Sequence, residues 1–184
     1  GVFSKWEDAP GSVVDPPTER TASSPESVLR GRDLYLGRTK EKLECAGCHG
    51  AKGKGDGPSF IDVKTFNKIV FGGDPSKMPE RVAELDAPAR DLWKQKLDAW
   101  GDPLRPADLT LGIYKGDRRP IDLYWRIAKG ITGTQMPAHY PGVNEAQIWD
   151  LVNFVLALPY QPELLEVEAT GAKGVTADAG AVRR

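Results

Sequence analysis

Cysteine, methionine and histidine are scarce in this chain of 184 residues, which contains two of each. No run of about 20 apolar residues is present, so we predict no transmembrane helix within the chain. The charges nearly balance, with 25 Lys and Arg against 26 Asp and Glu, and this balance argues against a nucleic-acid partner. The residues that follow Gly1 lack the apolar run of a signal peptide, so we expect none at this position. The length suits one domain with extensions, or at most two small domains.

Both cysteines lie in one pentapeptide, Cys45-Ala46-Gly47-Cys48-His49. The pattern Cys-x-x-Cys-His is typical of c-type haem attachment. Two thiols three residues apart lie on one turn of helix, where each can form a thioether with a vinyl group of the porphyrin. His49 follows directly, and its imidazole can take an axial position on the iron. The motif predicts one covalent haem c, through which single electrons move.

Other interpretations of the two cysteines lack supporting residues. A structural zinc site needs four ligands, often as two pairs, and the only histidine outside the motif is His139. A thioredoxin-like redox pair sits in a βαβ pattern, and no such alternation surrounds Cys45. A disulfide would close a very small loop and stabilise the fold little.

The iron needs a second axial ligand, for which methionine and histidine are suitable donors. Met136 lies in the segment 133–137, after a helix-like run and before a turn-rich stretch, where a loop can fold over the open haem face. Met78 and His139 are the alternatives. Each methionine could equally fill a gap in the core. We favour Met136.

Four segments, in the family's order, resemble the class I cytochromes c. They are the Gly31–Tyr35 helix motif, the haem motif, the Gly133–Met136 methionine loop and the C-terminal helix at Asp150–Val155. The resemblance implies an all-α, cytochrome c-like fold, in which N- and C-terminal helices cross around the covalent haem. A long intervening segment, absent from minimal members of the family, predicts a helical insertion.

The family also implies a partner for the ligating imidazole. Gly57-Pro58 is similar to the Gly-Pro that follows the haem motif in the family, where the proline carbonyl accepts a hydrogen bond from the histidine. The resemblance therefore makes Pro58 the partner of His49.

Cellular location follows from the resemblance, because the family attaches haem outside the cytoplasm. We expect a periplasmic protein, or one on the outer face of the cytoplasmic membrane, whose leader or lipid anchor was removed or lies upstream. The expected function is electron transfer as a subunit of a bacterial respiratory, membrane-associated complex, with other redox proteins as partners. Alternatives are a free periplasmic electron shuttle and, from another class, a haem enzyme or gas sensor with a labile sixth ligand.

Composition divides the chain into three parts. Residues 1–23 are rich in Pro, Ser, Thr and acids and form an extension. Residues 24–160 form the cytochrome c domain, with the insertion at about 60–102. Residues 161–184 are too poor in large apolar groups to form a core of their own.

Local signals predict the helices of the domain. Ser24 caps a helix that runs to about Gly37, and Asn144 caps the last helix, which runs to about 158. A helix is expected from about 121 to 129, ended by glycine. Within the insertion, a helical stretch opens at Pro79 and is divided at Pro88.

Two further residues are candidates for the haem site. Arg105 can pair with a haem propionate, because guanidinium matches carboxylate in a bidentate way, although a surface salt bridge is an equal alternative. Trp125, with its neighbours Tyr124 and Ile127, is a candidate to wall the haem, and aromatic residues at this spacing also serve as simple core.

Overall fold

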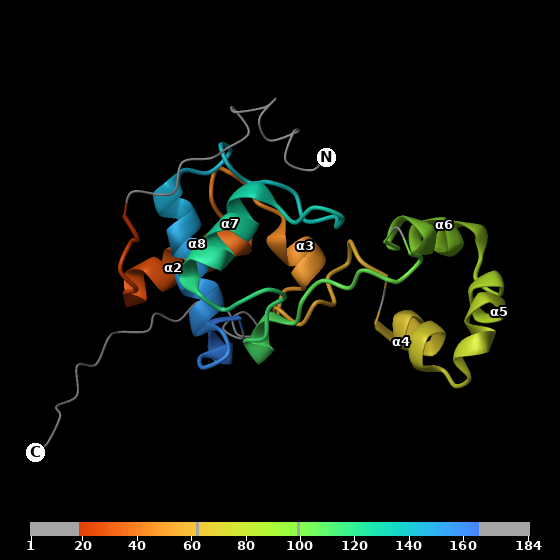
Figure 1. The fold of residues 1–184 in the computed structure, drawn as a ribbon. Helices are drawn as coiled ribbons and strands as arrows, with labels where there is room; N and C mark the ends of the chain where they lie inside the picture. The colour runs from red at the N-terminus through yellow and green to blue at the C-terminus, as the bar shows by residue number, and fades with distance from the viewer. Residues whose placement is uncertain (1–18, 62, 99, 166–184) are drawn as a thin grey trace, which may run out of the picture.

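The computed structural model of the protein describes residues 19–61, 63–98 and 100–165. These ranges contain no β-strand, only an isolated bridge between Leu97 and Pro103, and the predicted all-α fold is confirmed. The same ranges contain no helix with the length and apolar character that a membrane span requires. In chain order the helices are α2 (Pro25–Tyr35), α3 (Cys45–His49), α4 (Val63–Phe71), α5 (Met78–Ala83), α6 (Ala87–Gln95), α7 (Pro120–Lys129) and α8 (Glu145–Ala157) (Figure 1).

Short 3-10 turns lie at Pro75–Lys77, Leu109–Leu111 and Pro162–Leu165. Of the predicted terminal segments, residues 1–18 and 166–184 lie outside the described residues. The division into an extension, a domain and a tail therefore stays a prediction.

Helix α2 begins where the sequence predicts. The side-chain oxygen of Ser24 accepts a hydrogen bond from the backbone N–H of Ser27 at 3.2 Å, and Pro25 takes the first helical position. The helix ends at Tyr35, two residues earlier than predicted. Gly37 then adopts a φ of 68°, a left-handed conformation that glycine reaches without strain and that turns the chain away.

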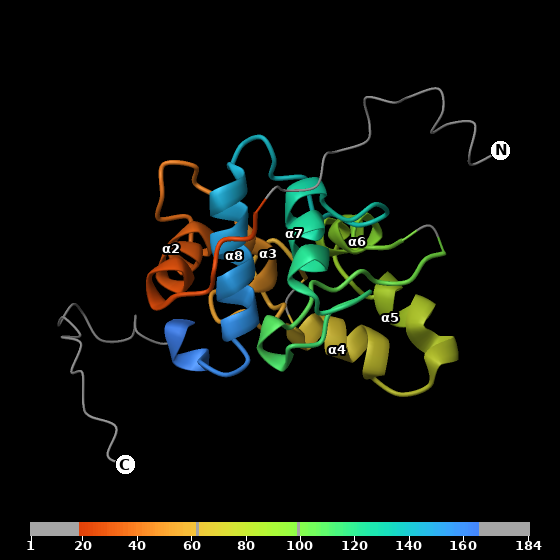
Figure 2. The ribbon, with the colours of Figure 1, turned by 60° about the vertical axis from the view of Figure 1, so that its left-hand side comes forward.

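Helix α8 lies between α2 and α7 (Figure 2). A capping box fixes its start: the Asn144 side chain accepts from the Gln147 N–H at 2.9 Å, and the Gln147 side chain accepts from the Asn144 N–H at 3.0 Å. Because helices pack on two sides of α8, its buried surface extends beyond a single stripe. The buried residues are Ile148, Trp149, Asp150, Leu151, Val152, Asn153, Phe154 and Val155.

The crossing of α2 and α8 depends on a glycine. A Cβ at Gly31 would lie 2.1 Å from the carbonyl oxygen of Asp150 and 2.7 Å from Cβ of Phe154. The close approach of the two helices therefore excludes any side chain at Gly31. This is the crossing of N- and C-terminal helices that the resemblance to class I cytochromes c implies.

Polar contacts set the orientation of the crossing. The buried Asp150 carboxylate accepts from Ser27 Oγ at 2.6 Å, and from Nε and Nη2 of Arg30 at 2.8 and 2.9 Å. Asn153 Nδ2 donates to Ser27 Oγ at 2.9 Å. Charge-assisted, bidentate bonds of this kind add geometric specificity to apolar packing.

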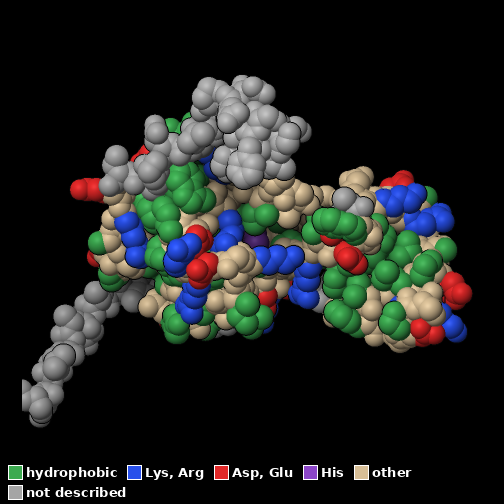
Figure 3. Space-filling model, in the orientation of Figure 1, with side chains coloured by type: hydrophobic (Ala, Val, Ile, Leu, Met, Phe, Trp, Pro, Cys, Tyr) green, Lys and Arg blue, Asp and Glu red, His purple; other side chains and the backbone are tan. Residues whose placement is uncertain are grey.

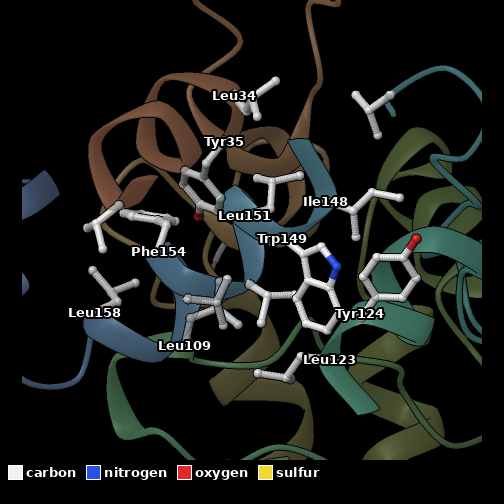
Figure 4. Packing of buried hydrophobic residues seen from close by; sticks show 14 of the residues in the cluster. Leu34, Tyr35, Leu109, Leu123, Tyr124, Ile148, Trp149, Leu151, Phe154 and Leu158 are labelled. Atoms are coloured by element: carbon white, nitrogen blue, oxygen red, sulfur yellow. The ribbon is translucent and has the colours of Figure 1, made fainter. Parts of the chain in front are cut away.

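Apolar side chains of α2, α7 and α8 form the main core (Figure 4). Tyr35 packs against Phe154 with ring centroids 5.3 Å apart, and Tyr124 packs against Trp149 at 4.6 Å. Leu109, which follows the insertion in sequence, joins the same core. The core therefore holds α2, α7 and α8 together as the helices that surround α3.

The predicted helical insertion consists of α4, α5 and α6, which form a lobe beside α3 (Figure 1). Pro88 divides the stretch as predicted, with Asp86 capping α6 at the N–H of Ala89. Helix α4 was not expected as a helix. The lobe has its own apolar cluster, formed by Phe60, Ile61, Phe66, Ile69 and Trp93.

Candidate haem-attachment site

The short helix α3 places both thiols of the motif on one turn. Cys45 and Cys48 are half-buried free cysteines, so the disulfide alternative is not adopted. Gly50 ends the helix with a φ of 83°. The phenol of Tyr35 donates a 2.6 Å hydrogen bond to the Gly50 carbonyl, which ties the end of the motif to α2.

The glycine-rich segment 50–58 wraps around the end of α3. The Gly57 N–H donates to the Cys48 carbonyl at 3.1 Å, and the Ser59 N–H donates to the Gly47 carbonyl at 2.8 Å. A Cβ at Gly57 would lie 2.2 Å from the Gly47 carbonyl oxygen, so only glycine permits this contact. The loop thus satisfies carbonyls that the five-residue helix leaves unpaired.

The partner of the His49 imidazole differs from the one predicted. Nδ1 lies 3.0 Å from the carbonyl oxygen of Ala107, and Pro58 is not the acceptor. The backbone bonds just described hold residues 57–59 against the helix backbone. The chain that returns from the insertion instead passes the ring, where the Leu109 N–H donates to the Gly53 carbonyl at 2.7 Å.

This contact determines the proton positions on His49. A carbonyl oxygen can only accept, so Nδ1 carries the proton and Nε2 keeps its lone pair. Burial lowers the pKa of His49, which favours the neutral ring, although the Ala107 carbonyl works in the opposite direction. Within the described ranges no hydrogen bond reaches Nε2. A neutral imidazole with a free Nε2 and an oriented Nδ1–H fits the role of an iron ligand.

The methionine loop returns along the end of α7. The Ile131 N–H donates to the Met136 carbonyl at 3.2 Å, and the Met136 N–H donates to Thr134 Oγ1 at 3.1 Å. Farther on, the His139 N–H donates to the Ile127 carbonyl at 3.2 Å. These bonds fold the segment back on itself, with Met136 half-buried at its turn.

The loop and α3 face the same region. Burial lowers the pKa of His139, and a positive charge on His49 would lower it further, so the two rings lie within electrostatic reach of each other. A small part of a histidine side chain is visible on the main body, on the side toward the insertion lobe (Figure 3). Met78, the alternative methionine, packs against the apolar cluster of the insertion.

Arg105 and Trp125, the other two candidates for the haem site, contact other residues of this chain. The guanidinium of Arg105 contacts the carbonyls of Lys54 and Gly55 at 3.3 and 3.5 Å, and lies 5.8 Å above the Phe66 ring. Trp125 is half-buried on α7, packed against the main core, with its ring edge-on to Tyr124 at 5.3 Å. A propionate contact for Arg105 and a haem contact for Trp125 stay predictions.

Sequence reasoning missed Ala107. The group that it supplies is a backbone carbonyl, which every residue carries, so no side chain marked it. The one signal in the sequence is the pair of prolines at 103 and 106, which favours an extended stretch before Ala107. Lys96, a buried cation that contacts the methionine loop, was also not predicted from the sequence.

The described residues do not support the alternative sites, a structural zinc site or a thioredoxin-like redox pair. The ranges that the structure describes include all cysteines and histidines of the chain, and no three His, Cys, Asp or Glu side chains gather there as a metal site. No strands flank α3 in these ranges, as a thioredoxin-like pair would require. Two adjacent free thiols followed by an oriented histidine, on an all-α frame, define a c-type haem protein.

Comparison with known protein families supports the assignment to the c-type haem proteins. The family model for cytochrome c matches residues 28–159, which is most of the chain. The chain therefore belongs to the cytochrome c family, as a class I c-type cytochrome domain, and is an electron-transfer haem protein. Membership implies a covalent haem c, with its iron, and electron transport as the function.

Among solved structures, the chain is similar to a chain of the reducing HAO-like protein complex of Kuenenia stuttgartiensis. The TM-score is 0.51 and the sequence identity is 26%, over 82% of this chain and 54% of that chain. The protein therefore spans about half the length of the chain that it matches. The comparison with curated proteins found no match.

Proposed function

We propose that the protein carries one haem c, attached through Cys45 and Cys48, with His49 and Met136 as axial ligands, and that it relays single electrons. The observation that supports this most is the 3.0 Å contact between His49 Nδ1 and the Ala107 carbonyl. It leaves Nε2 as the free donor atom of an oriented, neutral ring.

The bound haem would supply the one-electron chemistry, and the chain's residues would tune it. The Ala107 carbonyl holds the His49 ring in one orientation and makes Nε2 more basic. A neutral thioether at Met136 favours ferrous over ferric iron. If Trp125, which is half-buried on α7, walls the haem as predicted, it would limit water there and disfavour the more highly charged ferric state. If His49 and Met136 both bind the iron, no open position on the metal would remain for a substrate.

We further propose that the protein works outside the cytoplasm, in the periplasm or on the membrane face, as a subunit of a respiratory, membrane-associated complex. The similarity to a chain of the reducing HAO-like complex supports a place among other redox proteins. A free electron shuttle and a sensor with a labile sixth ligand are the alternatives that the experiments distinguish.

Optical spectra of the oxidised protein test the ligand assignment. An iron–thioether bond gives a weak absorption band in the far red, and Met136→Ala should abolish it. The reduction potential should fall, by on the order of 100 mV within the range that axial ligands span. Met78→Ala is the matched control and should leave both the band and the potential unchanged.

Two results would contradict the proposal. A band that survives Met136→Ala but disappears in Met78→Ala would assign the ligand to the insertion. A high-spin spectrum of the unmodified protein would indicate an open sixth position and favour the sensor alternative. The intact mass measures the number of haems, and we expect one.

A further inference from the structure

Lys96 is a buried cation at the border between the insertion and the methionine loop. It follows the last residue of α6 and is 8% exposed. Its ammonium donates to the Ser59 carbonyl and to Oε1 of Gln135, both at 2.6 Å. Gln135 in turn donates through Nε2 to the carbonyl of Gln95, at the end of α6. Three segments far apart in sequence therefore meet at one side chain.

This arrangement is unusual for a lysine. A buried lysine is normally paired with an acid. In the described part of the chain no ion pair reaches Lys96, and both of its acceptors are neutral. Hydrogen bonds from a charged donor to well-placed acceptors are among the stronger ones. The local structure thus keeps a costly buried charge where it ties the loop to the insertion.

The loop has few other restraints on this side. Around Met136, the residues Thr132, Gly133, Thr134, Gln135, Pro137 and Ala138 are all exposed. Its remaining hydrogen bonds are turns within the loop or bonds back to α7. Among described residues, the hydrogen bonds that join residues 131–138 to the insertion are those of Gln135 with Lys96 and Gln95.

We propose that Lys96 and Gln135 form a clasp by which the insertion holds the methionine loop closed and keeps Met136 on the iron. Lys96 is a positioning residue. It contacts Gln135, which directly precedes the proposed ligand Met136 in the chain. The inference rests on the proposed ligation by Met136. It gives the insertion a role in the stability of the sixth ligand.

Competition by imidazole measures this stability in the haem-loaded protein. Imidazole displaces a loosely held methionine, and the loss of the far-red band reports its apparent dissociation constant. We expect Lys96→Met, which keeps the apolar stem but removes the charge, to lower this constant about tenfold. Gln135→Ala should have a similar effect. The double variant should exceed neither single variant by much, because both remove the same contact.

Lys94→Met is the matched control, because Lys94 lies on the same helix with a side chain that is 72% exposed. It should bind imidazole as the unmodified protein does. Imidazole binding within about twofold of the unmodified protein in both Lys96→Met and Gln135→Ala would overturn the clasp. If Lys96→Met fails to fold, Gln135→Ala decides alone, because Gln135 is exposed.

The spectra separate the failure of the clasp from the failure of the ligand assignment. If the far-red band survives Met136→Ala, both the assignment and the role of the clasp fall. If Met136→Ala abolishes the band while the clasp variants bind imidazole unchanged, the clasp alone falls.

Discussion

At the residue scale, His139 has an environment that disfavours its charged form. Burial is the larger cause of its lowered pKa, and a positive charge on His49 would be the smaller one. The unfolded chain takes up this proton near the ordinary value of 6.5, at a higher pH than the folded chain. The stability that depends on a neutral His139 is therefore fully present above about pH 6.5 and is lost as the pH falls below that value.

We expect the free energy of unfolding of the haem-loaded protein to decrease on acidification below about pH 6.5, and His139→Gln to reduce this decrease. Denaturant unfolding at several values between about pH 5 and 8 measures the effect. The far-red band at each pH serves as the control that ligation is unchanged. The expectation would be wrong if the free energy of unfolding fell equally with pH in the variant and in the unmodified protein.

Single residues also mark the limit of prediction from sequence. The pentapeptide made Cys45, Cys48 and His49 the candidates for haem attachment because their side chains carry the chemistry at a fixed spacing. The acceptor for the His49 ring could not be assigned in the same way. Pro58 was expected by resemblance, yet the carbonyl that reaches the ring belongs to Ala107, brought there by the path of a distant segment.

At the element scale, the crossing of α2 and α8 depends on backbone contact at Gly31. Gly31→Ala would place a methyl group 2.1 Å from the Asp150 carbonyl oxygen, so the helices must separate. We expect a loss of about 1–3 kcal/mol of unfolding free energy, or more. Thermal or denaturant unfolding checks this. Leu29→Ala on the exposed side of the same helix is the control, and a similar loss there would contradict the packing argument.

Helix ends were predictable where a side chain makes the cap. Ser24 and Asn144 accept the expected backbone hydrogen bonds, and Pro88 divides the insertion. Helix α4 was not predicted, because its apolar residues pack into a small cluster that exists only once α6 lies against it. Phe66 and Trp93 meet there with ring centroids 6.2 Å apart. Tertiary contacts of this kind leave only a weak local signal.

At the scale of the whole molecule, the proposed membership of a membrane-associated complex can be tested by purification. We expect the native chain to fractionate with membranes and to co-migrate with other redox subunits after mild solubilisation. Removal of peripheral proteins by high salt serves as the control for weak electrostatic attachment. Recovery of the chain alone, in the fraction released without membranes, would favour the free shuttle.

The wrapping of residues 50–59 around α3 also constrains the order of biosynthesis. Those residues bond to the carbonyls of Gly47 and Cys48, and burial raises the pKa of the Cys45 thiol to about 11. Little of the nucleophilic thiolate would therefore exist at neutral pH once the chain has folded. We expect both thioethers to form on the unfolded polypeptide, before residues 50–59 close around α3.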